Sequence, residues 1–106
     1  MNEEIILGTE AKVILTIKPI SNKSADEFDW DVELYTNPRK KLVVNKYQCS
    51  PIEDTDRDYY VPFDSSKVGV GELNAEIVAY VPDPIFKDDG LRTERVRIES
   101  IATIIP

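Results

Sequence analysis

The amino-acid sequence predicts an all-β protein, and the fold we expect is an antiparallel immunoglobulin-like β-sandwich of about seven strands. The clearest signal is residues 73–81, where side chains alternate with the period of a half-buried strand. Glycine and proline residues bound this and other apolar segments at intervals that suit short strands. No segment has the pattern of a long helix. At 106 residues, the chain is expected to form one domain, residues 1–106.

Three strands are expected in the N-terminal half. Residues 9–18 alternate with a period of two and form the first of them. Residues 30–36 and 42–47 are joined by a turn at 37–41, so we expect them to pair as a hairpin. Residues 1–8 end in an apolar run and form either a first edge strand or an N-terminal arm that docks on a neighbour.

Two aromatic residues are expected to anchor the core. Trp30 is the only tryptophan, and its size suits it to fill the space between two sheets. Phe28 lies within a polar, turn-rich loop over residues 21–29 and can fold back onto the same core as an anchor.

The C-terminal half begins with a short strand at residues 59–63. Because Pro62 cannot donate a backbone hydrogen bond, we expect this strand at a sheet edge. Residues 64–69 read as a capped helical turn ended by glycine. A long loop at 83–91 then leads to the last strand, 93–105. Its alternation slips by one residue near Ser100, which indicates a β-bulge or a bend.

The last strand is predicted to pair with residues 73–81. Matching apolar to apolar residues also places opposite charges across the ladder, which is favourable by about 0.2–1 kcal/mol for each pair. The expected neighbours are Ala75 with Ile98, Glu76 with Arg97, Ile77 with Val96, Val78 with Arg95, and Tyr80 with Thr93.

Composition excludes several classes of function. The net charge of −7 repels nucleic-acid phosphates and anionic lipid, so we expect no nucleic-acid partner and no membrane partner. The chain has no histidine, which removes the usual catalytic triads and the commonest general base and zinc ligand. We therefore expect no enzymatic activity and no cofactor. The acidic start lacks a secretory pattern, so we expect synthesis in the cytoplasm of the producing cell.

Two groups of side chains invite a chemical interpretation. Cys49 is the only cysteine, so it cannot form an internal disulfide, and we expect a small, partly buried, unreactive thiol. Asp54, Asp56 and Asp58 have the spacing that begins a calcium loop, but the glycine and glutamate that such a loop requires are missing further on. A solvated acidic loop is the favoured reading, and weak cation binding stays open.

The remaining candidate functional feature is the apolar part of the protein surface. Apolar residues near the two termini and in the longest loop are candidates for contact with a neighbouring protein. The alternative is that each of them folds back to cap the sandwich. The candidate interface residues are Ile5, Ile6, Leu7, Ile85, Phe86, Ile101, Ile104 and Ile105.

Five segments carry a resemblance to a known family: residues 8–13, 30–35, 68–73, 80–83 and 89–94. In this order they resemble the small immunoglobulin-like virion structural proteins of tailed bacteriophages, including crAss-like phages. The family contains auxiliary capsid proteins, head-fibre proteins and baseplate domains. None of these segments is a catalytic motif, so no site residue is carried over from the family.

The resemblance implies a non-enzymatic phage virion structural protein. An auxiliary, or decoration, capsid subunit is the favoured form, and a tail or baseplate subunit is an alternative. The implied partners are other virion proteins, namely the major capsid protein or fibre and tail subunits, with a homo-oligomer also open. The implied location is the virion, after synthesis in the host cytoplasm. A carbohydrate- or receptor-binding module is a separate alternative, for which the candidate aromatic residues are Tyr35, Tyr59, Tyr80 and Phe86.

Overall fold

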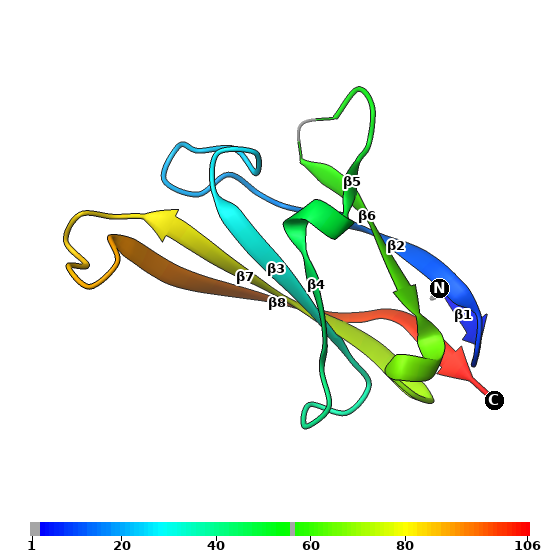
Figure 1. The fold of residues 1–106 in the computed structure, drawn as a ribbon. Coiled ribbons are helices and arrows are strands. Elements are labelled where there is room, and N and C mark those ends of the chain that lie inside the picture. Colours follow the sequence, from blue (N-terminus) through cyan, green and yellow to red (C-terminus); the bar gives the residue numbers. More distant parts are fainter. Residues whose placement is uncertain (1–2, 56) are drawn as a thin grey trace.

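In the computed structural model, which describes residues 3–55 and 57–106, two β-sheets pack face to face, so the all-β prediction is confirmed (Figure 1). One sheet has five strands in the order β1-β8-β7-β3-β4, and the other has three in the order β2-β6-β5. The strands are β1 (Glu3–Ile6), β2 (Glu10–Thr16), β3 (Asp29–Tyr35), β4 (Leu42–Asn45), β5 (Ser50–Pro51), β6 (Asp58–Asp64), β7 (Gly71–Pro82) and β8 (Leu91–Ile105). Two single 3-10 turns, η1 (Lys46–Gln48) and η2 (Ser65–Lys67), complete the described elements.

Strand β7, which contains the predicted strand 73–81, is the middle strand of the five-stranded sheet. It pairs with β3 on one side and β8 on the other, and its inward-facing residues Leu73, Ala75 and Ile77 are buried. The predicted cross-strand register with β8 is confirmed at all five neighbours, from Ala75 opposite Ile98 to Tyr80 opposite Thr93. The sequence pattern therefore located the strand, its partner and its register.

The five-stranded sheet is mixed, which corrects the expectation of a purely antiparallel sandwich. Strand β1 runs parallel to the end of β8, with Glu3 opposite Ala102 and Ile6 opposite Ile105. Of the two readings of the N-terminal segment, the edge strand is confirmed for residues 3–6. The turn that follows is held by the buried Ser65, whose hydroxyl accepts a hydrogen bond from the Gly8 N–H at 2.9 Å. This bond ties the turn between β1 and β2 to η2, which follows β6.

The predicted irregularity in β8 is present, but it is larger than a slip of one residue. Leu73 faces Ala102 and Ala75 faces Ile98, so four steps along β8 span two steps along β7. Ser100 absorbs the difference with a left-handed backbone, φ 56°. Because β8 contains two extra residues, an even number, the same alternate side chains point into the core before and after the irregularity. The predicted change of phase is therefore wrong, and Ala102 lies in the core.

The expectation that residues 59–63 form an edge strand is wrong, because β6 is the middle strand of its sheet. Around Pro62, however, one side of β6 has no neighbouring strand among the described residues. Strand β6 lies between β2 and β5. However, β5 is so short that it pairs only with Tyr59 and Tyr60. Pro62 lies beyond this pairing, where β2 is the only strand of the described sheet beside β6. The missing N–H of proline is tolerated there because that side of β6 is open.

The core between the sheets is built around Trp30, as predicted. Its ring is almost completely buried, and its Nε1–H donates a hydrogen bond of 3.0 Å to the Ala25 carbonyl oxygen. Tyr59 from the opposite sheet meets it edge to face, with ring centroids 4.9 Å apart. Phe28 is also buried in this cluster, so the polar loop does fold back.

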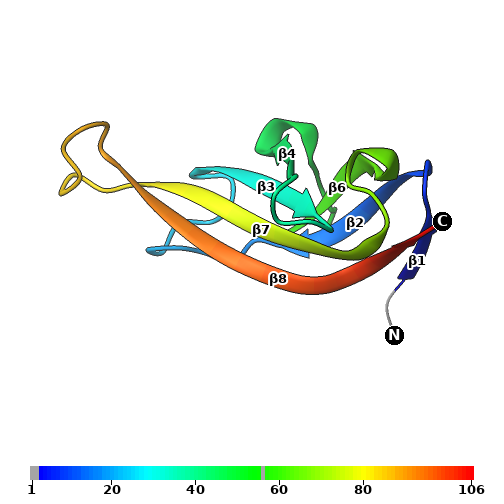
Figure 2. The same cartoon turned by 90° about the horizontal axis from the view of Figure 1, so that it is seen from below.

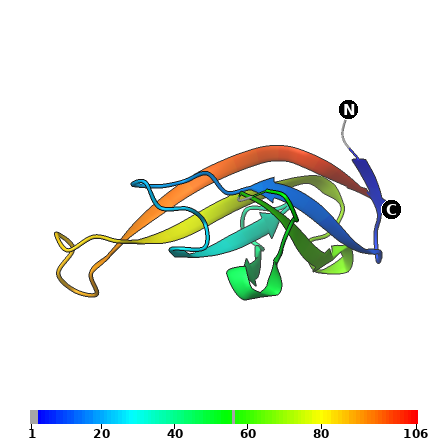
Figure 3. The same cartoon turned by 90° about the horizontal axis from the view of Figure 1, so that it is seen from above.

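The molecule is elongated, measuring 47 × 34 × 22 Å. The β7–β8 hairpin extends past the end of β3, and its loop forms one tip of the molecule (Figures 1 and 2). Strand β1 and the C-terminal end of β8 lie together at the opposite end, where the two strands pair (Figure 3). Apolar candidate residues from the loop and from the termini are therefore placed at opposite ends.

Candidate interaction surfaces

The loop of the β7–β8 hairpin is an ordered turn. Asp83 organises it, because its N–H donates to the Gly90 carbonyl oxygen at 2.7 Å and its carboxylate accepts from the Ile85 N–H at 3.1 Å. The same carboxylate lies 3.3 Å from Nε of Arg92. Gly90 closes the turn with a left-handed backbone, φ 73°. The loop conformation is therefore fixed by its own hydrogen bonds.

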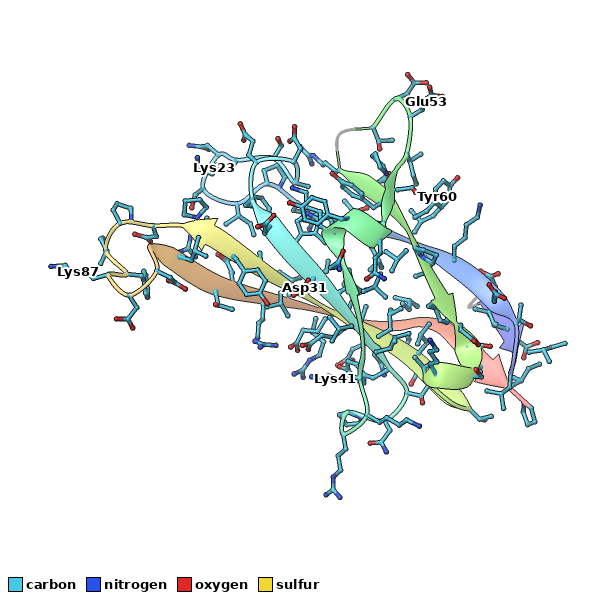
Figure 4. All side chains as sticks on the ribbon, viewed as in Figure 1. Lys23, Asp31, Lys41, Glu53, Tyr60 and Lys87 are labelled. Atoms are coloured by element: carbon cyan, nitrogen blue, oxygen red, sulfur yellow. The ribbon has the colours of Figure 1, made fainter. Side chains whose placement is uncertain are left out.

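This ordered loop presents apolar side chains to solvent at its tip. Ile85 is 80% exposed and Phe86 is 47% exposed. Lys87 lies next to them at the extreme end of the molecule (Figure 4). A pre-ordered apolar tip loses little conformational entropy on binding, which favours contact with a partner. The loop remains the strongest of the predicted contact surfaces.

The terminal end divides the remaining candidates. Ile6 is 61% exposed, and Leu7 is exposed beside it. Ile5 and Ile104, in contrast, are buried in the core and cannot meet a neighbour, because alternation in β1 and β8 turns them inward. Ile101 and Ile105 are half-buried. The terminal surface is therefore smaller than the sequence suggested.

A groove that the sequence did not reveal runs along one side of the sandwich. Strand β2 is an edge of its sheet, and β8 is an edge of the other sheet over residues 91–101, because β1 covers only residues 102–105. The space between these two edges forms two adjoining hollows that share Ile14 and Ile101. The second hollow, of ≈ 450 Å³, is lined mostly by apolar side chains. Only the strand pairing could have indicated this groove, because it depends on which edges lack a neighbour.

The outer face of the five-stranded sheet carries a charged cluster. Glu76 is buried there although it is ionisable, and Arg95 Nη1 lies 2.6 Å from its Oε2 atom. This hydrogen bond, the charge of Lys41 and a bond from Arg97 outweigh burial and hold the pKa of Glu76 below its ordinary value. In the described part of the chain, every buried side-chain nitrogen and oxygen has a hydrogen-bond partner. The cluster is a satisfied network, which is expected of a structural surface.

The acidic loop does not gather into a metal site within the described residues. Asp58 accepts a hydrogen bond from Thr16 Oγ1 at 2.7 Å, and Asp54 has a left-handed backbone, φ 64°. Asp56 lies outside the described residues. Across residues 3–55 and 57–106, no group of three or more histidine, cysteine or acidic side chains is close enough to hold a metal ion.

Cys49 is buried, as expected, and its Sγ lies 3.5 Å from the Asn45 carbonyl oxygen. Burial raises the pKa of its thiol to about 11, so the thiol is protonated near neutral pH. A protonated thiol is a poor nucleophile, which agrees with an unreactive role.

The aromatic residues considered for a carbohydrate platform do not share a surface. Tyr35 and Tyr59 are buried, and the Tyr80 hydroxyl donates to Asp31 at 3.0 Å on the sheet face. Tyr47, which no sequence pattern marks, is highly exposed, and its hydroxyl donates a hydrogen bond to Asp29 at 3.0 Å. Phe86 lies apart from these residues, in the loop between β7 and β8.

The two 3-10 turns are the only helical elements among the described residues, and neither is long and apolar enough to cross a membrane. Comparison with protein-family models, with curated proteins and with solved structures found no match to this chain. The geometry therefore defines a class only: a small β-sandwich with an ordered apolar loop at one end and a smaller apolar surface at the other.

Proposed function

We propose that this protein is a non-enzymatic structural subunit of a phage virion, an auxiliary capsid subunit that contacts other virion proteins through its hairpin loop and its terminal end. The observation that carries the proposal is the hydrogen-bonded loop that exposes Ile85 and Phe86. The separate apolar surface around Ile6, at the other end, supports a subunit that touches two neighbours.

Strand order supports an immunoglobulin-like sandwich. In that fold, one sheet has the order A-B-E-D and the other contains C, F and G. The order β2-β6-β5 corresponds to B-E-D, and β8-β7-β3 corresponds to G-F-C, with β4 as an added strand. The first strand, β1, pairs with the G-like strand rather than beside β2.

The absence of histidine from the whole sequence and the satisfied charged cluster both favour a structural role over catalysis. The burial of Tyr35 and Tyr59 weakens the alternative of a carbohydrate-binding module, because it leaves fewer aromatic rings to stack on a sugar. A tail or baseplate subunit would use the same two ends and differs only in its partner.

The direct test mixes the purified protein with phage particles assembled without it and measures co-sedimentation. The double variant Ile85→Ser/Phe86→Ser should weaken binding by about tenfold or more, because exposed apolar anchors at the centre of an interface typically contribute above 1 kcal/mol each. Val43→Ser is the matched control, since Val43 is 53% exposed on β4, away from both ends. Equal binding of the loop variant and the control would reject the loop as the contact. Binding to a glycan array, with no particle association, would reject the structural role.

A further inference from the structure

The open edge of β2 has backbone groups that are free to pair. Ile17 donates its N–H to the Arg57 carbonyl oxygen at 2.7 Å, and the Thr9 carbonyl oxygen accepts from Ser65, so the odd-numbered residues direct their backbone groups toward the β6 side. In an antiparallel ladder, the backbone N–H and C=O groups of successive residues point alternately to the two neighbouring strands. Lys12, Ile14 and Thr16 therefore direct theirs outward, and no described strand pairs with them there. This edge can accept one more strand.

The groove beside this edge is apolar in the middle and oppositely charged at its two ends. Ile14, 58% exposed, and Ile101 lie where the two hollows meet. Glu3, Glu4 and Glu10 line one end, where Lys12 is the basic exception. Lys18 lines the other end, whereas the Arg97 side chain is bound to Glu76 on the outer face of the five-stranded sheet. A complementary partner presents basic residues to the acidic end of the groove, apolar residues to its centre and acidic residues to its basic end.

We propose that the open edge of β2 binds the β2 edge of a second copy of this chain, antiparallel, with Ile14 on the two-fold axis. A second copy supplies the required pattern, because the two-fold rotation brings the acidic end of one groove to the basic end of the other. The interface is isologous, so each contact occurs twice. The two three-stranded sheets then join into one continuous sheet.

The charges select this register over its neighbours. Only outward-directed residues can exchange backbone hydrogen bonds, so even-numbered residues must face even-numbered residues. Centred on Ile14, the pairing places Glu10 opposite Lys18 of the second copy, twice, and Lys12 opposite Thr16. Centred on Val13, it forms no pair of opposite charges. Centred on Lys12, it places two lysines face to face, which is unfavourable.

Lys18 is within reach of this pairing although β2 ends at Thr16, because Ile17 is still hydrogen-bonded to Arg57 and keeps the chain extended. Thr16 adds a further favourable contact, since its hydroxyl binds Asp58 and so places a carboxylate near Lys12 of the second copy. The two Ile14 side chains meet at the centre, where each loses its exposure to water. This inference is independent of the virion role.

The test measures solution mass by light scattering across a range of protein concentrations at low and high salt. Wild type should form a dimer that high salt weakens. Glu10→Lys and Lys18→Glu should each weaken it by about tenfold or more, because two attractive pairs become repulsive. Mixing the two single variants should restore a dimer, since each then meets its complement, and the double variant Glu10→Lys/Lys18→Glu should dimerise by itself.

Ile14→Lys should also give a monomer, because it places two like charges on the two-fold axis. Val43→Lys is the control and should leave the solution mass unchanged, because Val43 lies on β4, an edge of the other sheet. Unfolding curves of all the variants check that each one is folded. A wild type that stays monomeric at several hundred micromolar would overturn the proposal. So would a dimer that survives Ile14→Lys, or a mixture of the two charge variants that stays monomeric.

Discussion

Glu33 and Glu76 lie directly opposite each other on β3 and β7, a position in which like charges repel. Arg95 bridges them, with its Nη1 atom 2.6 Å from Glu76 Oε2 and 3.5 Å from Glu33 Oε1. Lys41 Nζ lies 3.3 Å from Glu33 Oε1. Two carboxylates can face each other here because basic side chains from β8 and from the residue just before β4 share their charge.

Arg95→Ala should therefore destabilise the protein, because it leaves the buried Glu76 facing Glu33 with less compensation. The free energy of unfolding should fall only modestly, since the Arg95 side chain is half exposed and solvent partly screens its ion pairs. Denaturant unfolding measures it. The same substitution in a Glu76→Gln background should cost less, and an equal cost in both backgrounds would contradict the coupling.

Acidification should remove the stabilisation that Glu76 provides. Because its pKa is lowered in the folded state, the unfolded chain binds the proton more readily than the native chain as pH falls. The contribution is complete above the ordinary glutamate range and is lost as pH falls through the lowered folded-state pKa. In Glu76→Gln, the unfolding free energy should fall less steeply with acid over this window. Parallel curves for variant and wild type would contradict this.

Trp30→Ala should be among the most damaging single substitutions. It removes a buried ring from the centre of the core and should cost about 3–5 kcal/mol, a large part of the 5–15 kcal/mol typical of a domain. Trp30→Phe is the informative comparison, because it keeps an aromatic ring but deletes the hydrogen bond to Ala25. We expect a smaller loss of unfolding free energy for Trp30→Phe, and equal losses would argue against a cavity as the main cause.

Cys49 should resist thiol reagents in the native state. Its burial and its raised pKa, about 11, keep it protonated between pH 7 and pH 9, so iodoacetamide should modify it slowly. Denaturant should release fast modification, which mass spectrometry would follow. Rapid labelling of the folded protein would show that the thiol is accessible and ionised.

The irregularity in β8 should depend on one side-chain acceptor. The Ser100 N–H donates to Asn74 Oδ1 at 2.9 Å, which satisfies a backbone group that the register shift removes from the ladder. Asn74→Ala should therefore cost about 1 kcal/mol in unfolding free energy. Asn74→Asp retains an acceptor in the same place and should cost less, although Glu72 lies nearby. An equal cost for both variants would contradict this role.

The sequence predicted what depends on short-range alternation. The period of two placed β7, matched it to β8 residue by residue and turned Trp30 inward, because side-chain direction in a strand follows from position alone. The alternation was misleading at Ser100, because the odd-numbered apolar residues that follow it suggested that the inward-facing positions change from even to odd numbers. Two extra residues keep Ala102 inward, and no local pattern distinguishes one extra residue from two.

Long-range placement was the other limit. Ile5 and Ile104 read as free apolar termini because their burial depends on the parallel pairing of chain segments almost the whole sequence apart. The groove beside β2 was hidden for the same reason, since an open edge is a property of the sheet and not of the strand. The loop residues Ile85 and Phe86 are exposed, and the prolines, acids and glycine that bound them locally already indicated a loop.

The parallel pairing of β1 with β8 has a mechanical consequence. Tension that pulls the start of β1 and the end of β8 in opposite directions slides these strands along each other, since they run the same way. All hydrogen bonds between the two strands then carry the force together, whereas a hairpin pulled open from its ends breaks them one at a time. The sandwich is therefore built to resist stretching between the start of β1 and the end of β8.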